Sequence, residues 1–271
     1  MNLQLPPLAH QLAEIAVEAG KLILRHYFDG TEVHEKQNHS PVTLADKEAE
    51  ALIVARLEQH FPGVPILAEE EAARGKTTEI GERFFLVDPL DGTKEFLARN
   101  GEFTVNIALI ESNMPVFGVV VAPAQGRVFV GDVGASAAFE LSVSKELSLS
   151  KTGELDVTNA KNIYARKAPV GGLVAMVSRS HRDSKTEEYL ARYPITEMMA
   201  AGSSLKFCLI AAGEADLYPR HGRTMEWDIA AGHAILLAAG GNVTQLDGTP
   251  FFYGKRAQGF ANPYFVAKGR D

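Results

Sequence analysis

The 271-residue chain has 46% hydrophobic and 23% charged residues, which is ordinary for a globular enzyme and allows one large domain or two closely packed halves. Its formal net charge of −7 argues against nonspecific nucleic-acid binding, which needs a basic surface, but does not exclude a phosphorylated small molecule. A single cysteine, Cys208, excludes an internal disulfide and favours a cytosolic protein, with Cys208 in the core. No apolar run is long enough to span a bilayer, and residues 1–7 lack the regions of a signal peptide.

The first seventy residues predict two helices and a short strand. Apolar residues at helical spacing indicate a helix over residues 8–23, and a polar loop follows over residues 30–40. The segment Thr43–Asp46 resembles a capping box, and it opens a second helix that stops at residues 61–63. Residues 64–68 predict a short strand that ends at the acidic run Glu69–Glu71.

The rest of the chain alternates between strand and helix patterns. Residues 84–87 indicate a buried strand, and residues 104–110, 116–122 and 127–130 an antiparallel meander. A less regular stretch follows over residues 141–162. Beyond it we expect strands at 173–178 and 216–218 and helices at 184–192, 203–212 and 227–239. This layout predicts layered helices and sheets in two halves, residues 1–140 and 141–271, that form one functional unit.

Two carboxylates, Asp88 and Asp91, lie three residues apart directly after the buried strand, where Pro89 and Gly92 indicate a turn. Carboxylates this close repel each other, and burial would raise their pKa values unless cations neutralise them. Mg²⁺ prefers such oxygen ligands. Taken alone, the segment is more typical of an Asx-type surface turn, Glu69 of a solvated loop and Asp228 of a helix N-cap.

Two longer segments together resemble the signatures of the inositol monophosphatase superfamily. Residues 88–96, DPLDGTKEF, resemble its D-P-x-D-G-T-x-x-F motif, and residues 227–241, WDIAAGHAILLAAGG, resemble its W-D-x-A-A-G motif with the following apolar helix. The upstream Ala68-Glu69-Glu70 resembles the superfamily's G-E-E, with alanine in place of glycine. The order of the motifs agrees, and the resemblance covers nearly the whole chain.

This resemblance implies a mixed α/β (α+β) fold, a layered αβαβα sandwich of the inositol monophosphatase/fructose bisphosphatase type, with its site between the two halves. It also implies a centre of two or three Mg²⁺ ions held by Glu69, Asp88, the Leu90 carbonyl, Asp91 and Asp228. Glu69 and Thr93 would orient the attacking water. In the phosphonucleotidase branch an aspartate at the position of Asp46 completes this relay, and the alternative for Asp46 is a plain capping-box carboxylate.

Residues 178–181, 202–210 and 215–220 further resemble CysQ-type 3'(2'),5'-bisphosphate nucleotidases. The substrate-binding set that this implies is Glu69, Leu90, Asp91, Gly92, Thr93, Ser180, His181, Gly202, Ser203, Lys206 and Asp228. Ser203, Ser204 and Lys206 would hold a second phosphate near a helix start, and Arg179, His181 and Arg220 could add positive charge. The alternatives are that Ser203 only caps its helix and that Lys206 is a solvated side chain.

The expected function is therefore Mg²⁺-dependent hydrolysis of the 3'-phosphate of 3'-phosphoadenosine 5'-phosphate to AMP and phosphate, with inhibition by lithium and a place in sulfate assimilation. The alternatives are an inositol monophosphatase and a metal-dependent phosphate-binding protein without activity. The resemblance also implies a cytoplasmic protein, peripheral at the inner membrane in some members, with a small-molecule nucleotide bisphosphate as its partner. The sequence leaves the oligomeric state open. His233 and Trp227 we expect to pack beside Asp228.

Overall fold

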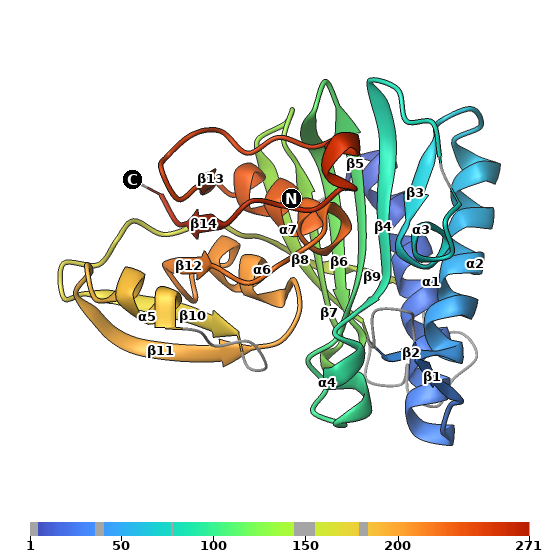
Figure 1. The fold of residues 1–271 in the computed structure, drawn as a ribbon, viewed down its shortest axis with the longest axis horizontal. Coiled ribbons are helices and arrows are strands. Elements are labelled where there is room, and N and C mark those ends of the chain that lie inside the picture. The colour runs from blue at the N-terminus through green and yellow to red at the C-terminus, as the bar shows by residue number, and fades with distance from the viewer. Residues whose placement is uncertain (1–4, 36–40, 77, 144–154, 179–183, 271) are drawn as a thin grey trace.

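In the computed structural model, residues 5–35, 41–76, 78–143, 155–178 and 184–270 are described, and they build a layered α/β molecule (Figure 1). The larger sheet has seven strands in the order β3-β4-β5-β6-β7-β8-β9. These strands are β3 (Ile66–Ala68), β4 (Arg83–Asp91), β5 (Thr104–Glu111), β6 (Met114–Ala122), β7 (Arg127–Asp132), β8 (Ala137–Val143) and β9 (Leu155–Asn162). Among the described strands of this sheet, β3 and β4 pair in parallel and the other neighbours are antiparallel, and the run from β5 to β7 confirms the predicted meander.

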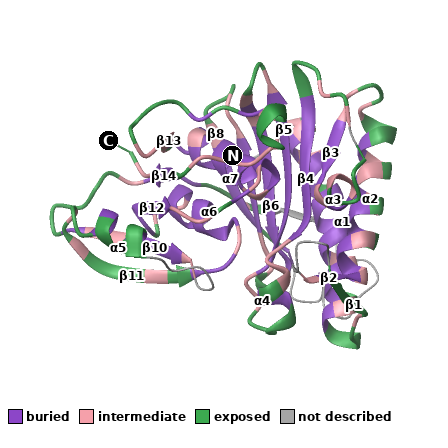
Figure 2. Ribbon diagram, in the orientation of Figure 1, coloured by how far each residue is buried: buried purple, intermediate pink, exposed green. Residues whose placement is uncertain are grey.

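Alternating side chains of β4 divide the core between the two faces of this sheet. Phe85 and Val87 pack toward α1 (Pro7–Asp29) and α2 (Leu44–His60). Phe84 and Leu86 belong instead to the cluster of α6 (Leu205–Ala211) and α7 (Glu226–Ala238). Because successive side chains point to opposite faces and helices cover both, residues 84–87 of this strand form an uninterrupted apolar run that is buried (Figure 2).

The smaller sheet has five strands in the order β11-β10-β12-β14-β13. They are β10 (Leu173–Ser178), β11 (Ile195–Ala201), β12 (Leu217–Arg220), β13 (Asn242–Gln245) and β14 (Phe265–Lys268). Helix α5 (Ser184–Leu190) packs on its outer face through Tyr189 and Leu190, whereas α6 and α7 lie between the two sheets. The layers therefore follow the order α1/α2, sheet, α6/α7, sheet, α5, which confirms the predicted αβαβα sandwich.

The remaining elements are short: β1 (Val33–Glu35), β2 (Pro41–Thr43), α3 (Glu69–Ala73), α4 (Thr93–Leu97), η1 (Pro123–Gln125) and η3 (Arg256–Gln258). The expectation of an irregular stretch over residues 141–162 was wrong for its described part, because β8 ends at Val143 and β9 begins at Leu155. Strand β9 is polar and pairs on one side only, so it lacks the apolar pattern of an inner strand. The predicted division after residue 140 falls inside β8, and the two-half organisation stays a prediction.

The segment from Asp88 to Asp91 is a bulged strand and not the simple turn predicted after a short strand. Asp88 pairs with Asn106 and Asp91 with Thr104, so three steps along β4 match two along β5. This extra residue is a β-bulge, where Pro89 is tolerated because no ladder hydrogen bond is needed from it. Gly92 then takes the left-handed conformation, with φ +90°, and is the N-cap residue of α4.

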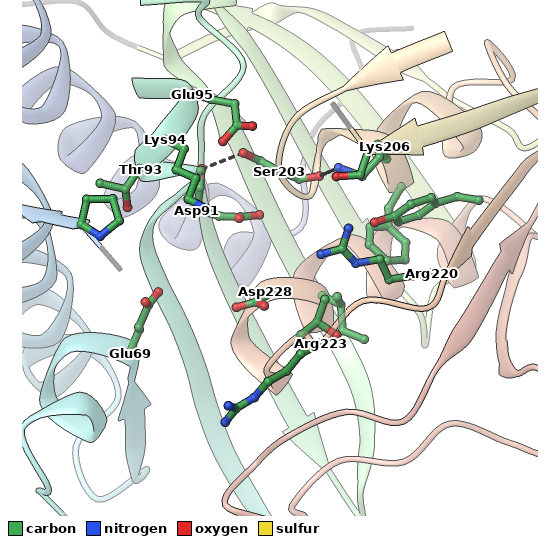
Figure 3. A pocket seen from close by; sticks show the side chains of 17 residues that line it. Glu69, Asp91, Thr93, Lys94, Glu95, Ser203, Lys206, Arg220, Arg223 and Asp228 are labelled. Carbon is green, nitrogen blue, oxygen red and sulfur yellow. Dashed lines mark hydrogen bonds between the residues drawn. The ribbon is translucent and has the colours of Figure 1, made fainter. Parts of the chain in front are cut away.

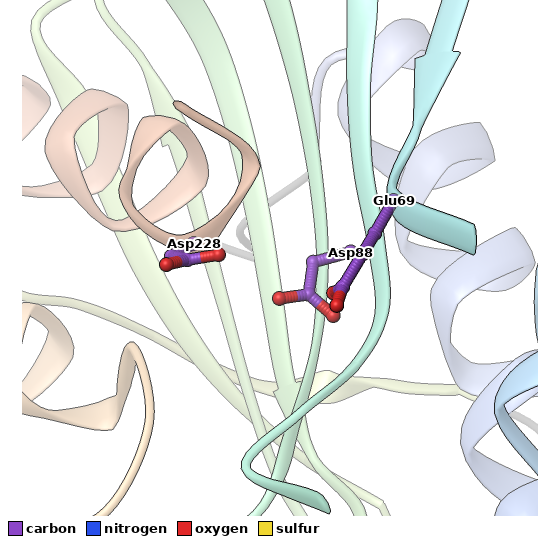
Figure 4. Close-up of side chains that lie close together, drawn as sticks. All are labelled: Glu69, Asp88 and Asp228. Atoms are coloured by element: carbon purple, nitrogen blue, oxygen red, sulfur yellow. The ribbon is translucent and has the colours of Figure 1, made fainter. Parts of the chain in front are cut away.

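Helix α7 lies unusually close to the large sheet because two strand residues facing it have no side chain. A Cβ added at Gly118 would collide with the Ala231 carbonyl, and one added at Gly131 would come within 2.5 Å of the Ile235 Cα. This close packing brings the first turn of α7, which carries Asp228, toward the bulge of β4 (Figure 4).

Candidate active site

Three carboxylates from separate elements meet at one end of the large sheet. Glu69 is the first residue of α3, Asp88 lies in the bulge of β4 and Asp228 in the first turn of α7. One oxygen of each lies within 4.8 Å of an oxygen of the other two (Figure 4). Segments more than a hundred residues apart thus form one acidic cluster of the kind that holds a hard cation.

The electrostatics of this cluster favour a bound cation. Burial raises the pKa of Asp88 well above its usual range, and the negative charges of Glu69, Asp91 and Asp228 raise it further. Burial likewise raises the pKa of Asp228, with Asp91 and Glu69 as the next causes. Because desolvation and mutual repulsion both oppose ionisation, a divalent cation among these oxygens would stabilise the ionised forms. The donor set fits Mg²⁺, which takes oxygen ligands.

Asp91 lies outside this cluster of three and on the wall of the adjoining cavity. Burial raises its pKa to about 6, while the Lys206 ammonium and the Ser204 N–H act in the opposite direction. Its Oδ2 accepts the Ser204 N–H at 2.6 Å and the Asn106 amide at 3.4 Å. The sequence analysis did not identify Asn106, because a single polar residue within an apolar strand pattern does not by itself indicate a functional role.

Asp46 and Thr93 form the hydrogen bond that a water-activating pair requires. The Thr93 hydroxyl donates to Asp46 Oδ1 at 3.2 Å. The other oxygen of Asp46 accepts the amide of Thr43 at 2.7 Å and its hydroxyl at 2.6 Å, which closes the predicted capping box. Both interpretations of Asp46 therefore describe contacts that the structure contains. The Leu90 carbonyl lies 3.5 Å from the Thr93 hydroxyl, and Leu90 itself is buried.

A cavity of about 290 Å³ opens beside these groups (Figure 3). Seven of the predicted site residues line it: Glu69, Asp91, Gly92, Thr93, Ser203, Lys206 and Asp228. Arg220 and Arg223 also line it, and Arg223 was not among the predicted residues although a second arginine near Arg220 is a readable signal. Cationic side chains and carboxylates therefore face the same space, as a site for a metal and a phosphorylated ligand requires.

Ser203 and Lys206 reach the cavity, but their polar groups also hold the loop before α6. The Ser203 hydroxyl bonds to the carbonyls of Asp91 and Glu102 at 2.7 and 2.8 Å. Lys206 donates to the carbonyls of Ser203 and Ala201 at 2.6 and 3.1 Å. Burial lowers the Lys206 pKa to about 8, and it is only 3% exposed. The alternative of a solvated lysine was therefore wrong.

The helix start was predicted two residues too early. Helix α6 begins at Leu205, and Ser203 precedes it in the left-handed conformation with φ +53°, so Ser203 is not its N-cap. The Gly202 N–H donates to a carboxylate oxygen of Glu102 at 2.9 Å. Two other predicted substrate residues, Ser180 and His181, lie with Arg179 outside the described residues.

The residues expected to be structural are buried. Cys208 is fully inaccessible in the main core. His233 is 1% exposed, and its Nδ1 lies 2.9 Å from the Tyr253 hydroxyl. Trp227 is 7% exposed and packs against Phe260, so it supports the helix turn that carries Asp228. No helix within the described ranges is long and apolar enough to cross a membrane.

Comparison with known proteins agrees with this geometry. The model of the inositol monophosphatase family matches residues 5–269. The chain belongs to this family. Within it, the chain is 41% identical to the 3'(2'),5'-bisphosphate nucleotidase CysQ of Escherichia coli K12 over 94% of this chain and 97% of that protein. It is 38% identical to the CysQ nucleotidase of Buchnera aphidicola, over 95% of this chain and 92% of the relative.

Solved structures of the family superpose over nearly the whole chain. The crystal structure of CysQ from Bacteroides thetaiotaomicron has a TM-score of 0.80 at 37% identity and covers 97% of both chains. An IMPase of Thermotoga maritima has a TM-score of 0.73 at 26% identity, over 94% of this chain and 89% of that one. The likeness is thus stronger to a CysQ structure than to this IMPase.

Proposed function

We propose that this protein is a Mg²⁺-dependent 3'(2'),5'-bisphosphate nucleotidase that hydrolyses 3'-phosphoadenosine 5'-phosphate to AMP and phosphate. The observation that carries the proposal is the meeting of Glu69, Asp88 and Asp228 within 4.8 Å beside a cavity that also contains Lys206 and Arg220. Relatives that match over more than nine-tenths of their length at 38–41% identity are named as nucleotidases of this specificity. An inositol monophosphatase is the weaker alternative, since the IMPase structure is only 26% identical.

The proposed metal ligands are Glu69, Asp88, Asp91, Asp228 and the carbonyl of Leu90, and they would hold two or three Mg²⁺ ions. When bound, Mg²⁺ supplies Lewis-acid polarisation of the phosphoryl oxygens, activation of a water and neutralisation of charge at the leaving oxygen. The bulge of β4 serves this set because Pro89 and Leu90, between Asp88 and Asp91, have no partner in the regular ladder, which leaves the Leu90 carbonyl available. Gly92 and Thr93 follow at once, so their N–H groups can receive the substrate phosphate.

The chain's own acid–base group is proposed to be Thr93 with Asp46. Since the Thr93 hydroxyl donates to Asp46 Oδ1, its oxygen lone pairs are free to accept a hydrogen from the attacking water. Glu69 would orient the same water from the other side. The water oxygen then bonds to phosphorus while one of its protons passes through the Thr93 hydroxyl to Asp46. The bond from phosphorus to the 3'-oxygen breaks, and that oxygen takes up a proton from solvent as AMP leaves.

We propose that the remainder of the substrate extends along the Ser203–Lys206 side of the cavity. Lys206 uses two of its three donors on backbone carbonyls, which leaves one for a phosphate oxygen. Arg220, 8% exposed on the cavity wall, adds a second positive charge. Gly202, Ser203, Ser180 and His181 complete the proposed set. The cytoplasmic location expected from the sequence is also a proposal, with which the reduced, buried Cys208 agrees.

The decisive experiment measures phosphate release from 3'-phosphoadenosine 5'-phosphate, inositol 1-phosphate and fructose 1,6-bisphosphate, each with Mg²⁺ and with EDTA. We expect kcat/KM to be highest for the bisphosphonucleotide and to vanish with EDTA. A preference for inositol 1-phosphate would identify an inositol monophosphatase. Binding of the nucleotide without phosphate release from any substrate would identify a phosphate-binding protein.

A further inference from the structure

A buried hydrogen-bond network joins the loop before α6 to Asp91. Ser204, which is 1% exposed, donates its N–H to Asp91 Oδ2 at 2.6 Å and its hydroxyl to Asn106 Oδ1 at 2.6 Å. The Asn106 amide group in turn faces the same Asp91 oxygen at 3.4 Å. Thr104 completes the network through a 2.9 Å hydrogen bond to the Ser204 hydroxyl.

The network crosses between the two layers of the sandwich. Asp91 ends β4 and Asn106 lies in β5, both in the large sheet, whereas Ser204 precedes α6. Asn106 uses its oxygen on Ser204 and its nitrogen on Asp91, so the two contacts fix the orientation of its amide. Asn106 therefore fixes the position of Ser204 by accepting its hydroxyl, and the Ser204 N–H fixes Asp91 by donating to its Oδ2.

The consequence for Asp91 concerns geometry. A carboxylate with one oxygen held by a short N–H bond cannot rotate freely, and its other oxygen points in a defined direction. The Ser203 hydroxyl also holds the Asp91 backbone through its carbonyl at 2.7 Å. Outer groups that orient a metal-binding carboxylate in this way generally change metal affinity when they are removed.

We propose that Ser204, held by Asn106, is a positioning residue that aims the free oxygen of Asp91 at the metal site. Through the same peptide it couples that ligand to Ser203 in the loop before α6 and to Lys206 in the first turn of that helix. This inference rests on the proposed function, because it needs Asp91 as a metal ligand. It goes beyond that function by assigning to a residue outside the metal and substrate sets a role in cation affinity.

The test compares Ser204→Ala and Asn106→Ala with Thr104→Val as the matched control. Thr104→Val removes a buried hydroxyl from the same network but leaves Asn106 bound to both Ser204 and Asp91, whereas each alanine variant breaks the Ser204–Asn106 hydrogen bond. Mg²⁺ binding is measured by calorimetry on the metal-free protein without substrate. We expect the Kd for Mg²⁺ to rise about 10-fold in Ser204→Ala and Asn106→Ala and to stay within about twofold in Thr104→Val.

Kinetics provide the second readout. In Ser204→Ala the half-saturating Mg²⁺ concentration should rise by the same factor, while kcat at saturating Mg²⁺ returns close to the wild-type value. A variant damaged only in its fold would not be restored by Mg²⁺. Affinities in both alanine variants equal to that of Thr104→Val would overturn the inference. Asp91→Asn is measured in parallel, and an unchanged Mg²⁺ affinity there would instead overturn the ligand assignment of the proposed function.

Discussion

Asp46 uses its two carboxylate oxygens for different partners. Oδ2 accepts the amide and the hydroxyl of Thr43 and so stabilises the start of α2, while Oδ1 accepts the hydroxyl of Thr93 at the edge of the cavity. A helix cap is worth about 1 kcal/mol of stability, whereas a positioned general base contributes about 100-fold or more to a rate. The two contributions can be separated because they use separate oxygens.

Asp46→Asn should remove the catalytic contribution and keep the cap. Asparagine has one acceptor oxygen, which can replace Oδ2 against Thr43, and its NH₂ group then faces Thr93 and makes that hydroxyl an acceptor. We expect kcat to fall about 100-fold or more, with a free energy of unfolding within about 1 kcal/mol of wild type. Phosphate release and urea unfolding measure the two effects. As a control, Thr43→Val should lose stability and keep kcat, and near-normal turnover in Asp46→Asn would leave Asp46 as a helix cap only.

At the scale of elements, α7 determines the position of Asp228, the third carboxylate of the acidic cluster. Its first turn is held by the fully buried Glu226, which accepts the N–H groups of Gly254 and Lys255 at 2.8 Å each. Along its length the helix packs directly on the backbone of β6 and β7 at Gly118 and Gly131. The position of Asp228 therefore depends on contacts far from the cavity.

Gly131→Ala should destabilise the protein by about 1–3 kcal/mol, as overpacking generally does. Its Cβ would lie 2.5 Å from the Ile235 Cα, and a helix backbone cannot yield as a flexible side chain can. Gly134→Ala is the matched control, since its Cβ would meet nothing closer than the Asp132 carboxylate at 3.5 Å. Chemical unfolding gives both stabilities. Equal stabilities of the two variants would show that α7 can move away from the sheet at no cost.

The same helix contains a pH-sensitive residue away from the cavity. Burial lowers the pKa of His233 to about 3, compared with an ordinary value of 6.5. As the pH falls below 6.5, His233 becomes protonated in the unfolded chain but stays neutral in the folded protein. The free energy of unfolding therefore falls until the pH reaches about 3. Between about pH 7.5 and pH 4.5 this contributes about 2–3 kcal/mol of destabilisation.

His233→Asn removes this titration and keeps a polar partner for Tyr253. Urea unfolding of the metal-free protein at both pH values should therefore show a loss on acidification that is about 2–3 kcal/mol smaller in the variant than in wild type. All other ionisable groups are common to the two proteins, so the difference reports on His233. An identical loss in both would mean that the imidazole is protonated in the folded state.

At the scale of the whole molecule, cation binding and stability are linked because the acidic cluster joins elements from distant parts of the chain. Burial raises the pKa of Asp91 to about 6 in the folded, metal-free protein, above its ordinary value of 3.8. The folded state thus binds more protons than the unfolded chain at mildly acidic pH. The protonated Asp91 carboxyl therefore stabilises the folded protein fully below about pH 4, and this stabilisation is lost as the pH rises through about 6.

Mg²⁺ should therefore stabilise the protein more at about pH 7.5 than at about pH 5, where it must displace a proton from Asp91. For one displaced proton the apparent Kd rises about 10-fold for each pH unit below 6. Thermal unfolding with MgCl₂, and with NaCl at equal ionic strength, measures the increase in Tm. Asp91→Asn should lose the part of the pH dependence that Asp91 contributes, while Asp88 and Asp228, whose pKa values are also raised, keep the rest. A pH-independent Tm increase in wild type would contradict the assigned ligands.

From the sequence by itself we predicted the layered architecture, which the structure confirms, and a set of metal ligands, which stays a prediction. The helical spacing of α1, α2 and α7 and the apolar run of β4 are local patterns that burial on one or both faces imposes, so they are readable along the chain. The two acidic signatures were recognised only through their resemblance to the family's motifs, because Asp88, Asp91 and Asp228 taken alone are more typical of a turn and a helix cap. The polar strand β9 was missed because an edge strand has no such pattern.

Only the tertiary structure decided how the site is held. Asn106 gave no signal in the sequence, and Ser204 was expected to bind phosphate. Their hydrogen bonds to Asp91 instead join positions that the chain brings together only when the two layers pack. The bulge between Asp88 and Asp91 is likewise defined by the register of β4 against β5 and by no residue of β4 alone. Hydrogen bonds between residues distant in sequence form only when the layers pack. Sequence motifs therefore predict the carboxylate ligands but not the residues, such as Ser204 and Asn106, that orient them.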